Sequence, residues 1–246
     1  MANTLDQLVI YSENNVSAQV IAIADESKGA DGLVGKADIQ SLSDLEGRSV
    51  AYAQATPSDF FLRYLLSENG VDLSKIDLKP VADPQIAGNI FIAGEADAAV
   101  TFEPFLSQAL KSEENRMIAS TKDFPMLILD AILAKREKVR KNPLLYLKFL
   151  SAWFKSVDYY YSNRKDALRI MATGLNMDFK ETDEILSTIK LKKLQDNITS
   201  FDRNENYNIH DLINNVADIW KANGYVQQNI QSGPLVNSTL INALNQ

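Results

Sequence analysis

Residues 49–70 read SVAYAQATPSDFFLRYLLSENG, a short apolar run followed by a longer amphipathic one. The apolar run Ser49–Ala53 predicts a buried strand, and Pro57–Glu68 predicts a helix. Gly70 is expected to end that helix, because glycine readily adopts the left-handed conformation that follows many helices. A strand, a turn and a helix in this order form the building unit of α/β proteins.

The same unit recurs on both sides of this stretch. Four further apolar runs predict strands: Val20–Ala24, Leu78–Val81, Ala98–Thr101 and Ile128–Ala134. Strands that alternate with helices are typical of a parallel sheet covered by helices. The first part of the chain therefore predicts an α/β fold.

After Ala134 the composition changes to long helices, and no further strand is predicted. Asn142 is expected to cap a helix that starts at Pro143, since proline has no N–H to leave unpaired there. This helix carries apolar residues at spacings of three and four, which predicts a stripe facing the core. The stripe consists of Leu147, Leu150, Phe154, Val157 and Tyr161.

Three more helices are expected in the C-terminal part. One covers Asp166–Thr173 and is expected to stop before Gly174, and another lies within Lys180–Thr188. Asn208 is expected to cap the third, which Gly224 ends.

Composition narrows the chemistry that the chain can perform. It has 246 residues, of which 46% are hydrophobic, so it can bury a sizeable core. The net charge of -7 argues against a nucleic-acid partner, because phosphate binding needs a basic face. The chain has no cysteine and a single histidine, His210, which excludes thiolate and histidine-built metal sites. We therefore predict no metal and no cofactor.

The sequence contains no apolar run that approaches the roughly 20 residues needed to span a bilayer. Met1–Asp6 lacks the basic and apolar regions of a signal peptide. We expect either a cytoplasmic protein or an export signal that lies outside this sequence.

Four fragments carry a resemblance to a known family, and they occur in the family's order. They are GADGLV at 29–34, SLSDLEGRSVAY at 41–52, GEADAAVTFEPF at 94–105 and KNP at 141–143. Together they resemble the substrate-binding proteins of nitrate, sulfonate and taurine ABC importers, a group that also includes binders of thiamine-pyrimidine precursors. The likeness extends over nearly the whole chain.

The resemblance implies a two-lobed α/β fold of the type II periplasmic-binding-protein class, with mixed sheets flanked by helices and a helical C-terminal part. It implies that residues 1–38 and 123–246 form lobe one and residues 39–122 form lobe two. Family members begin with a further strand–helix–strand–helix segment that has no counterpart here. Lobe one is therefore expected to be incomplete at its N-terminus, and a second chain could supply the segment.

The resemblance also implies a function. Such proteins close on a small solute by rotating at the two chain crossings between the lobes, and they deliver it to a membrane permease. The expected ligand is a sulfonate, nitrate or pyrimidine precursor, and the expected location is periplasmic or otherwise extracytoplasmic. The alternative is a ligand-sensing or regulatory module that uses the same fold without transport.

The segment Thr56-Pro57-Ser58-Asp59 lies where a strand ends and a helix begins, a position that favours an anion. Because the family contacts ligand at this turn, the resemblance implies ligand contacts from Thr56, Ser58 and Phe60. The alternative is an ordinary helix start, in which Thr56 caps and Asp59 completes a capping box.

Two further groups of ligand-binding candidates lie near the predicted lobe crossings. Ser27, Gly29 and Asp31 fall in the loop where the family places ligand contacts, although a polar turn with a flexible glycine is the alternative. Glu103 follows a strand at an edge where α/β sheets collect ligands, or else it only caps the next helix. Asp130 places a charge inside an apolar run, which requires a partner or a solvent-filled cleft.

Several other residues receive no functional role. His210 is expected at the surface near a helix start, and Tyr159–Tyr161 are expected to form core and surface of one helix. Lys190, Lys192 and Lys193 are expected to form a solvated face.

We predict that the chain is not an enzyme. Fungal thiamine-pyrimidine synthases share the fold, but they depend on a cysteine-rich motif and an active-site histidine. This chain has no cysteine, and its one histidine lies in the helical C-terminal part.

Overall fold

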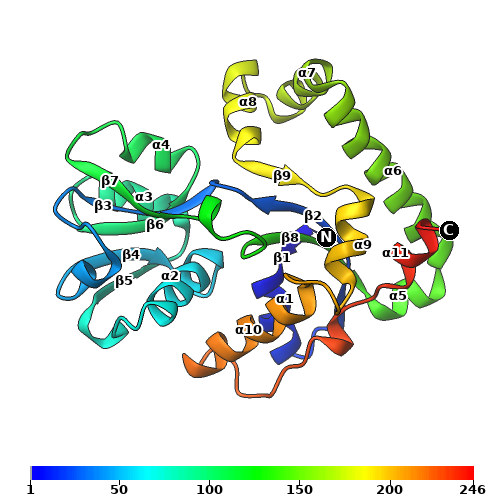
Figure 1. The fold of residues 1–246 in the computed structure, drawn as a ribbon, viewed down its shortest axis with the longest axis horizontal. Helices are drawn as coiled ribbons and strands as arrows, with labels where there is room; N and C mark the ends of the chain where they lie inside the picture. Colours follow the sequence, from blue (N-terminus) through cyan, green and yellow to red (C-terminus); the bar gives the residue numbers. More distant parts are fainter. Residues whose placement is uncertain (1) are drawn as a thin grey trace.

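Two separate β-sheets organise the chain, and helices pack against each of them (Figure 1). The computed structural model describes residues 2–246. The first sheet contains, in spatial order, β1 (Ala2–Thr4), β8 (Leu129–Lys135), β2 (Ala18–Ser27) and β9 (Ile189–Leu191). The second contains β5 (Asp77–Val81), β4 (Ser49–Ala53), β6 (Ala98–Phe102), β3 (Asp31–Lys36) and β7 (Asn115–Ser120). We call the first sheet with its helices lobe one, and the second sheet with its helices lobe two.

Strand directions differ between the two lobes. In lobe two β4 runs parallel to β5 and β6, as the alternation of strands and helices predicts, whereas β3 pairs antiparallel with β6 and β7. The pairs of lobe one are all antiparallel. The second sheet therefore has the expected mixed pairing, and the antiparallel strands β2, β3, β7 and β8 carry the chain between the lobes.

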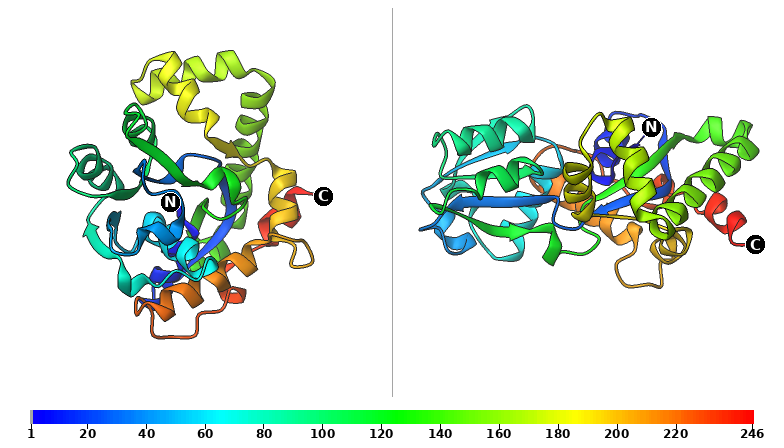
Figure 2. Two further views of the ribbon diagram at one scale, coloured as in Figure 1. Left: turned by 60° about the vertical axis from the view of Figure 1, so that its left-hand side comes forward. Right: turned by 90° about the horizontal axis from the view of Figure 1, so that it is seen from above.

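The chain crosses between the lobes twice (Figure 2). It leaves lobe one after β2 and enters the second sheet at β3, so this sheet starts before the lobe boundary predicted at residue 39. It returns through residues 121–128, between β7 and β8. Both crossings lie side by side in Figure 1.

The helices of lobe two are α2 (Pro57–Glu68), α3 (Pro84–Ile92) and α4 (Phe105–Ala109). Helix α2 has the predicted bounds. The Thr56 hydroxyl accepts a hydrogen bond from the Ser58 amide at 3.3 Å, and Gly70 follows with φ of 64°. Local capping signals therefore set both ends of this helix.

Lobe one contains the remaining α-helices of the described chain. They are α1 (Leu5–Glu13), α5 (Arg136–Lys141), α6 (Pro143–Ser162), α7 (Arg164–Leu175), α8 (Phe179–Ser187), α9 (Leu194–Phe201), α10 (Ile209–Ala222) and α11 (Thr239–Leu244). Asn208 caps α10 through hydrogen bonds from the His210 and Asp211 amides, as predicted. No helix among residues 2–246 is long and apolar enough to cross a membrane.

Three details of lobe one correct the sequence-based expectations. The region after β8 contains β9, a strand of three residues that pairs with the end of β2. Helix α7 continues through Gly174, and Asn176 takes the left-handed conformation instead. Asn142 precedes α6 but makes no side-chain capping bond. Gly174 does not end α7 because a glycine inside a helix lowers stability by only about 1 kcal/mol, which tertiary packing can offset.

The apolar stripe of α6 also differs from the prediction at its end. Leu150, Phe154 and Val157 are buried as expected, but Tyr160 is buried and Tyr161 is exposed. A turn of 3.6 residues allows steps of three or four, and the contact with α8 selects Tyr160, whose hydroxyl lies 3.5 Å from the Leu186 carbonyl oxygen.

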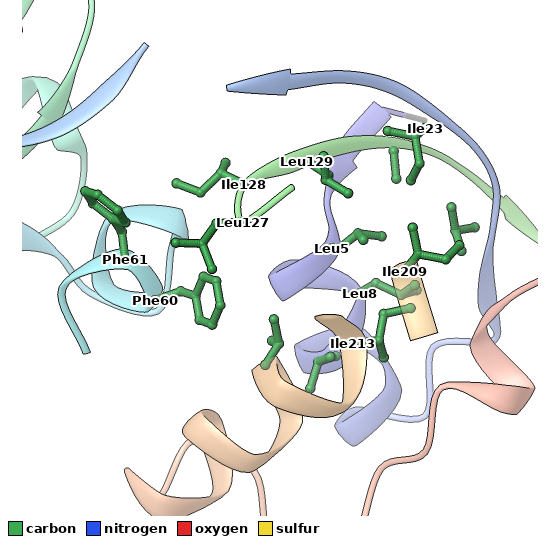
Figure 3. Close-up of a cluster of buried hydrophobic side chains, with 14 of the residues drawn as sticks. Leu5, Leu8, Ile23, Phe60, Phe61, Leu127, Ile128, Leu129, Ile209 and Ile213 are labelled. Carbon is green, nitrogen blue, oxygen red and sulfur yellow. The ribbon is translucent and has the colours of Figure 1, made fainter. Parts of the chain in front are cut away.

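One apolar core runs through both lobes (Figure 3). Phe60 extends from α2 toward Leu127 of the return crossing and toward α10, and Phe61 makes an edge contact with Phe124 of the same crossing, with ring centroids 5.9 Å apart. Phe60 makes an edge contact with Trp220 of α10, with ring centroids 6.0 Å apart. Helix α2 of lobe two therefore packs against α1 and α10 of lobe one.

Candidate functional site

The two crossings between the lobes are joined by hydrogen bonds centred on Thr121. Its hydroxyl lies 2.8 Å from the Ser27 hydroxyl and accepts a bond from the Gly29 amide at 3.0 Å. It also donates to the Asp31 carbonyl oxygen at 3.0 Å. Three predicted site residues, Ser27, Gly29 and Asp31, thus meet at the point where the lobes connect.

A group of carboxylates surrounds this point. Asp25 of β2 lies directly opposite Asp130 of β8 in the antiparallel register, so both side chains are on the same face of the sheet. Burial, together with the charges of Asp130 and Asp31, raises the pKa of Asp25 to about 7. Burial likewise raises the pKa of Asp31 to about 6, with a contribution from Asp130, and raises that of Asp130.

Helix α1 adds a fourth carboxylate from another direction. Asp6, in the first turn of α1, is buried, and burial raises its pKa to about 6, with a smaller effect from the charge of Asp130. Next to it, the Gln7 side-chain amide donates to the Ala55 carbonyl oxygen at 2.6 Å. This bond ties α1 of lobe one to the start of α2 in lobe two.

The candidates at the start of α2 are largely buried. Ser58 and Phe60 are each 1% exposed, and Thr56 is partly buried. Asp59 accepts from the Ala55 amide at 2.9 Å and pairs with Arg63 at 2.5 Å. The turn is therefore capped by its own side chains, and Phe60 belongs to the core between the lobes. Ligand contact by these residues stays a prediction.

Glu103 lies at the end of β6, close to the first crossing, where its amide donates to the Ala30 carbonyl oxygen at 2.8 Å. Its carboxylate accepts from the Ser107 amide at 3.1 Å and the Ser107 hydroxyl at 2.9 Å, the capping role named as the alternative. Glu103 also lines a cavity of about 270 Å³ between the lobes, which Glu181 and Thr188 complete from lobe one.

The structure thus groups Ser27, Gly29, Asp31 and Asp130 at the crossings, with Glu103 nearby, and the Gln7–Ala55 hydrogen bond joins the first turn of α1 to the start of α2. Sequence reasoning missed Asp25, Asp6 and Thr121. The argument that singled out Asp130, a charge within an apolar strand, applies equally to Asp25 in the strand AQVIAIADES. Nothing in the local sequence signals Asp6 or Thr121, because their roles depend on contacts with distant segments.

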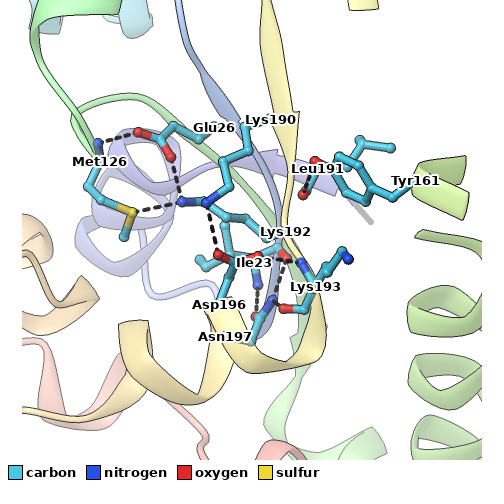
Figure 4. Close-up of polar contacts among 10 residues, drawn as sticks. All are labelled: Ile23, Glu26, Met126, Tyr161, Lys190, Leu191, Lys192, Lys193, Asp196 and Asn197. Carbon is cyan, nitrogen blue, oxygen red and sulfur yellow. Dashed lines mark hydrogen bonds and ion pairs between the residues drawn. The ribbon is translucent and has the colours of Figure 1, made fainter. Parts of the chain in front are cut away.

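A buried ion pair fixes the return crossing to lobe one (Figure 4). Lys192, 4% exposed, pairs with Glu26 of β2, and Glu26 also accepts from the Met126 amide at 2.7 Å. The expectation that Lys192 belongs to a solvated face is therefore wrong, because β9 carries it inward beside β2. Lys190 does keep a partly exposed pair with Asp196 at 2.9 Å.

Among residues 2–246, no three or more His, Asp or Glu side chains come close enough together to hold a metal ion.

Two α/β lobes joined by two crossings define the class of two-lobed solute-binding folds. Comparison with known families agrees, because a family model described as NMT1/THI5 like matches residues 18–167, and the chain belongs to that family. Proteins of Brucella abortus and Brucella melitensis, named as binding proteins, are 25% identical over 166 residues, which is 65% of this chain. The chain spans about half the length of these relatives, 51%.

Solved structures share the fold at low sequence identity. The periplasmic aliphatic sulphonate binding protein SsuA from Escherichia coli has a TM-score of 0.77 and 16% identity, covering 97% of this chain and 81% of that protein. The alkanesulfonate-binding protein SsuA from Xanthomonas axonopodis pv. citri, bound to MOPS, has a TM-score of 0.72 and 12% identity, covering 96% and 79%. The desulfurization enzyme DSZB has a TM-score of 0.71 and 12% identity, covering 99% and 85%. The shared fold thus includes binding proteins and an enzyme.

Proposed function

We propose that this protein is the solute-binding component of an ABC importer and that it holds its solute where the two crossings meet. The observation that carries the proposal is the cluster of three carboxylates, Asp25, Asp31 and Asp130, at that junction. The cluster lies on a fold shared with sulfonate-binding proteins. Solutes bind between the lobes of such folds, and rotation at the crossings encloses them.

The charge of the junction favours one ligand class among those that the family resemblance implies. Desolvation and mutual repulsion raise the pKa values of Asp25 and Asp31, so a further negative charge nearby would be unfavourable. A ligand with N–H donors or a protonated ring nitrogen would instead form charge-assisted hydrogen bonds. We therefore assign the solute to the pyrimidine-precursor class rather than to the sulfonates or nitrate.

The partners and location follow from the same proposal. A solute-binding component delivers its ligand to a permease at the membrane surface, which places the protein outside the cytoplasm. The periplasmic sulphonate binding protein of Escherichia coli supports this location as a structural relative.

A binding role is proposed over a catalytic one. The chain has no cysteine, and its one histidine lies at the start of α10, away from the carboxylate group. Asp25, Asp31 and Asp130 provide proton acceptors, and Ser27 hydrogen-bonds to the Asp31 carboxylate, but no histidine accompanies this pair in the described chain.

A second polypeptide is proposed to complete lobe one. Strand β1 is at the edge of its sheet and pairs with β8 alone, which leaves backbone groups available for another strand. Helices α6 and α7 of the same lobe expose apolar side chains, including Leu145, Phe149 and Ile170, and Ile170 lines a cavity of about 460 Å³. Native mass spectrometry of the protein from its own cells should show a stoichiometric second polypeptide that Phe149→Asp releases. A single polypeptide species would contradict the proposal.

The ligand assignment is tested by thermal unfolding and calorimetric titration with a 4-aminopyrimidine, an alkanesulfonate and nitrate. The aminopyrimidine should raise the melting temperature as its concentration rises. At a hundred times its Kd, the free energy of unfolding should increase by about 2.7 kcal/mol. Asp130→Asn should weaken this binding by roughly tenfold or more, whereas Asp218→Asn, at an exposed position of α10, should leave it unchanged.

The outcomes separate the parts of the proposal. Binding of the alkanesulfonate or nitrate would overturn the ligand class while keeping the binding role. The absence of a response to every compound would count against solute binding itself, and turnover of any of them would establish an enzyme.

A further inference from the structure

A second polar site lies in lobe one, where α9, the start of α10 and α11 meet (Figure 1). His210, Arg203 and Ser238 contribute to the wall of a cavity of about 580 Å³. A smaller cavity of about 210 Å³ adjoins it, with Gly233, Val236 and Ser238 lining both. The proposed solute site at the crossings shares none of the residues that line either cavity.

His210 does not have the surface position expected from the sequence. It is 6% exposed, and its Nδ1 atom lies 3.2 Å from the Ser232 hydroxyl. Burial lowers the pKa of His210, and the positive charge of Arg203 lowers it further, whereas Asp211 opposes the change. The imidazole therefore lies close to the positively charged guanidinium of Arg203.

Two guanidinium groups lie beside the turn at Gly233 and Pro234, between the cavities. Arg136 donates to the Pro234 carbonyl oxygen, and the Arg203 Nη2 atom lies 3.7 Å from where a Cβ on Gly233 would be. Within residues 2–246, neither guanidinium is within ion-pair distance of a carboxylate.

The acidic residues near these cavities are occupied by neighbouring amides. Asp202 accepts from the Asn204 amide at 3.0 Å and from its side-chain nitrogen at 2.9 Å. Asp211 accepts from the Asn208 side-chain nitrogen at 2.8 Å. Within the described chain, the two guanidinium groups thus have no carboxylate partner, while the nearby carboxylates accept hydrogen bonds from amides.

The smaller cavity contains a buried hydrogen-bond donor, the Gln19 side-chain amide, that lacks an acceptor in the described chain. Gln19, 4% exposed, lines the smaller cavity, and its Nε2 atom has no hydrogen-bond partner in the described chain. A buried amide without a partner is unfavourable, and native proteins usually satisfy such groups with protein, water or ligand atoms.

We propose that the two adjoining cavities bind a small organic oxyanion, a carboxylate or a phosphate monoester. Oxygens in the larger cavity would accept from Arg203 and His210, and an oxygen that reaches the smaller cavity would accept from the unpartnered Gln19 amide. Guanidinium groups suit such anions because their N–H groups match two oxygens at once. The larger cavity provides room for an organic group beyond the anionic head.

The single histidine makes the site directly observable, because one imidazole gives one set of NMR signals. We would follow these signals during titration with inorganic phosphate, glycerol phosphate and citrate, with sodium chloride at matched ionic strength as a control. An oxyanion should shift the signals to saturation and raise the pKa of His210, since a bound negative charge favours imidazolium. Comparison of the affinities for phosphate and citrate shows whether the site prefers a phosphate or a carboxylate.

Arg203→Gln should weaken this binding by roughly tenfold or more, because it removes a charged donor. Arg140→Gln is the matched control, an exposed arginine of α5 that lines neither cavity. Gln19→Leu should lower the affinity and raise the stability of the unliganded protein, since it removes the unsatisfied amide.

Asp130→Asn should leave oxyanion affinity unchanged, which separates this site from the proposed solute site. A response that sodium chloride reproduces, that does not saturate, or that Arg203→Gln retains in full would overturn the proposal.

Discussion

Replacing Asp25 by asparagine tests whether the carboxylates at the crossings carry a real electrostatic cost. The pKa of Asp25 rises from 3.8 to about 7 because of burial and of the charges of Asp130 and Asp31. A group whose pKa is raised by folding favours the folded state when protonated, so its contribution to stability is lost as pH rises from about 4 to about 7. Asparagine keeps the shape of the side chain and removes the charge.

The size of the effect follows from the shift. A difference of about three pKa units corresponds to about 4 kcal/mol for the ionised group. Asp25 is partly exposed and shares its repulsion with two neighbours, so we expect Asp25→Asn to stabilise the protein by about 1 to 2 kcal/mol at pH 8. That advantage should shrink steadily as the pH is lowered toward 4.5.

Urea unfolding of the wild type and the variant at several pH values measures this difference directly. Asp218→Asn, in α10, provides the control, because its side chain is exposed and its effect should stay within about 0.5 kcal/mol. An Asp25→Asn protein that is no more stable at pH 8, or whose advantage does not depend on pH, would refute the electrostatic reasoning.

Three further predictions concern stability and can be checked by urea unfolding. Lys192→Met leaves the buried Glu26 carboxylate unpaired and should destabilise the protein by about 3 to 5 kcal/mol. Lys180→Met, at an exposed ion pair, is the control and should cost less than about 0.5 kcal/mol. Equal effects of the two substitutions would contradict the burial of the Lys192–Glu26 pair. Asn208→Ala should cost about 1 kcal/mol through loss of a helix cap, and Asn142→Ala, with no capping bond to lose, should cost clearly less. Phe60→Ala should destabilise by about 3 to 5 kcal/mol, and a value below 1 would place this ring outside the shared core.

The sequence predicted best what local signals control. Helix α2 was placed to the residue, because Thr56, Pro57 and Gly70 mark its ends through capping and backbone preference. Strand β4 was likewise placed to the residue. The three-residue strand β9 was missed, since a segment of that length has too few residues for a periodic pattern.

Contacts between distant segments could not be predicted in this way. Asp25 lies opposite Asp130, and Phe60 lies against Trp220, because of how the chain folds back on itself. Lys192 resembled a surface lysine until its pairing with Glu26 was known. The candidate site was therefore predicted as scattered residues, and the structure brought together those near the crossings.

The apolar core that continues from α2 into α1 and α10 limits how far the halves of the protein can separate. A wide opening would expose Phe60 and Trp220 to water, so domain motion should be restricted to small rotations even without a bound solute. Calorimetry should accordingly record one cooperative heat-absorption peak for a protein that contains two sheets.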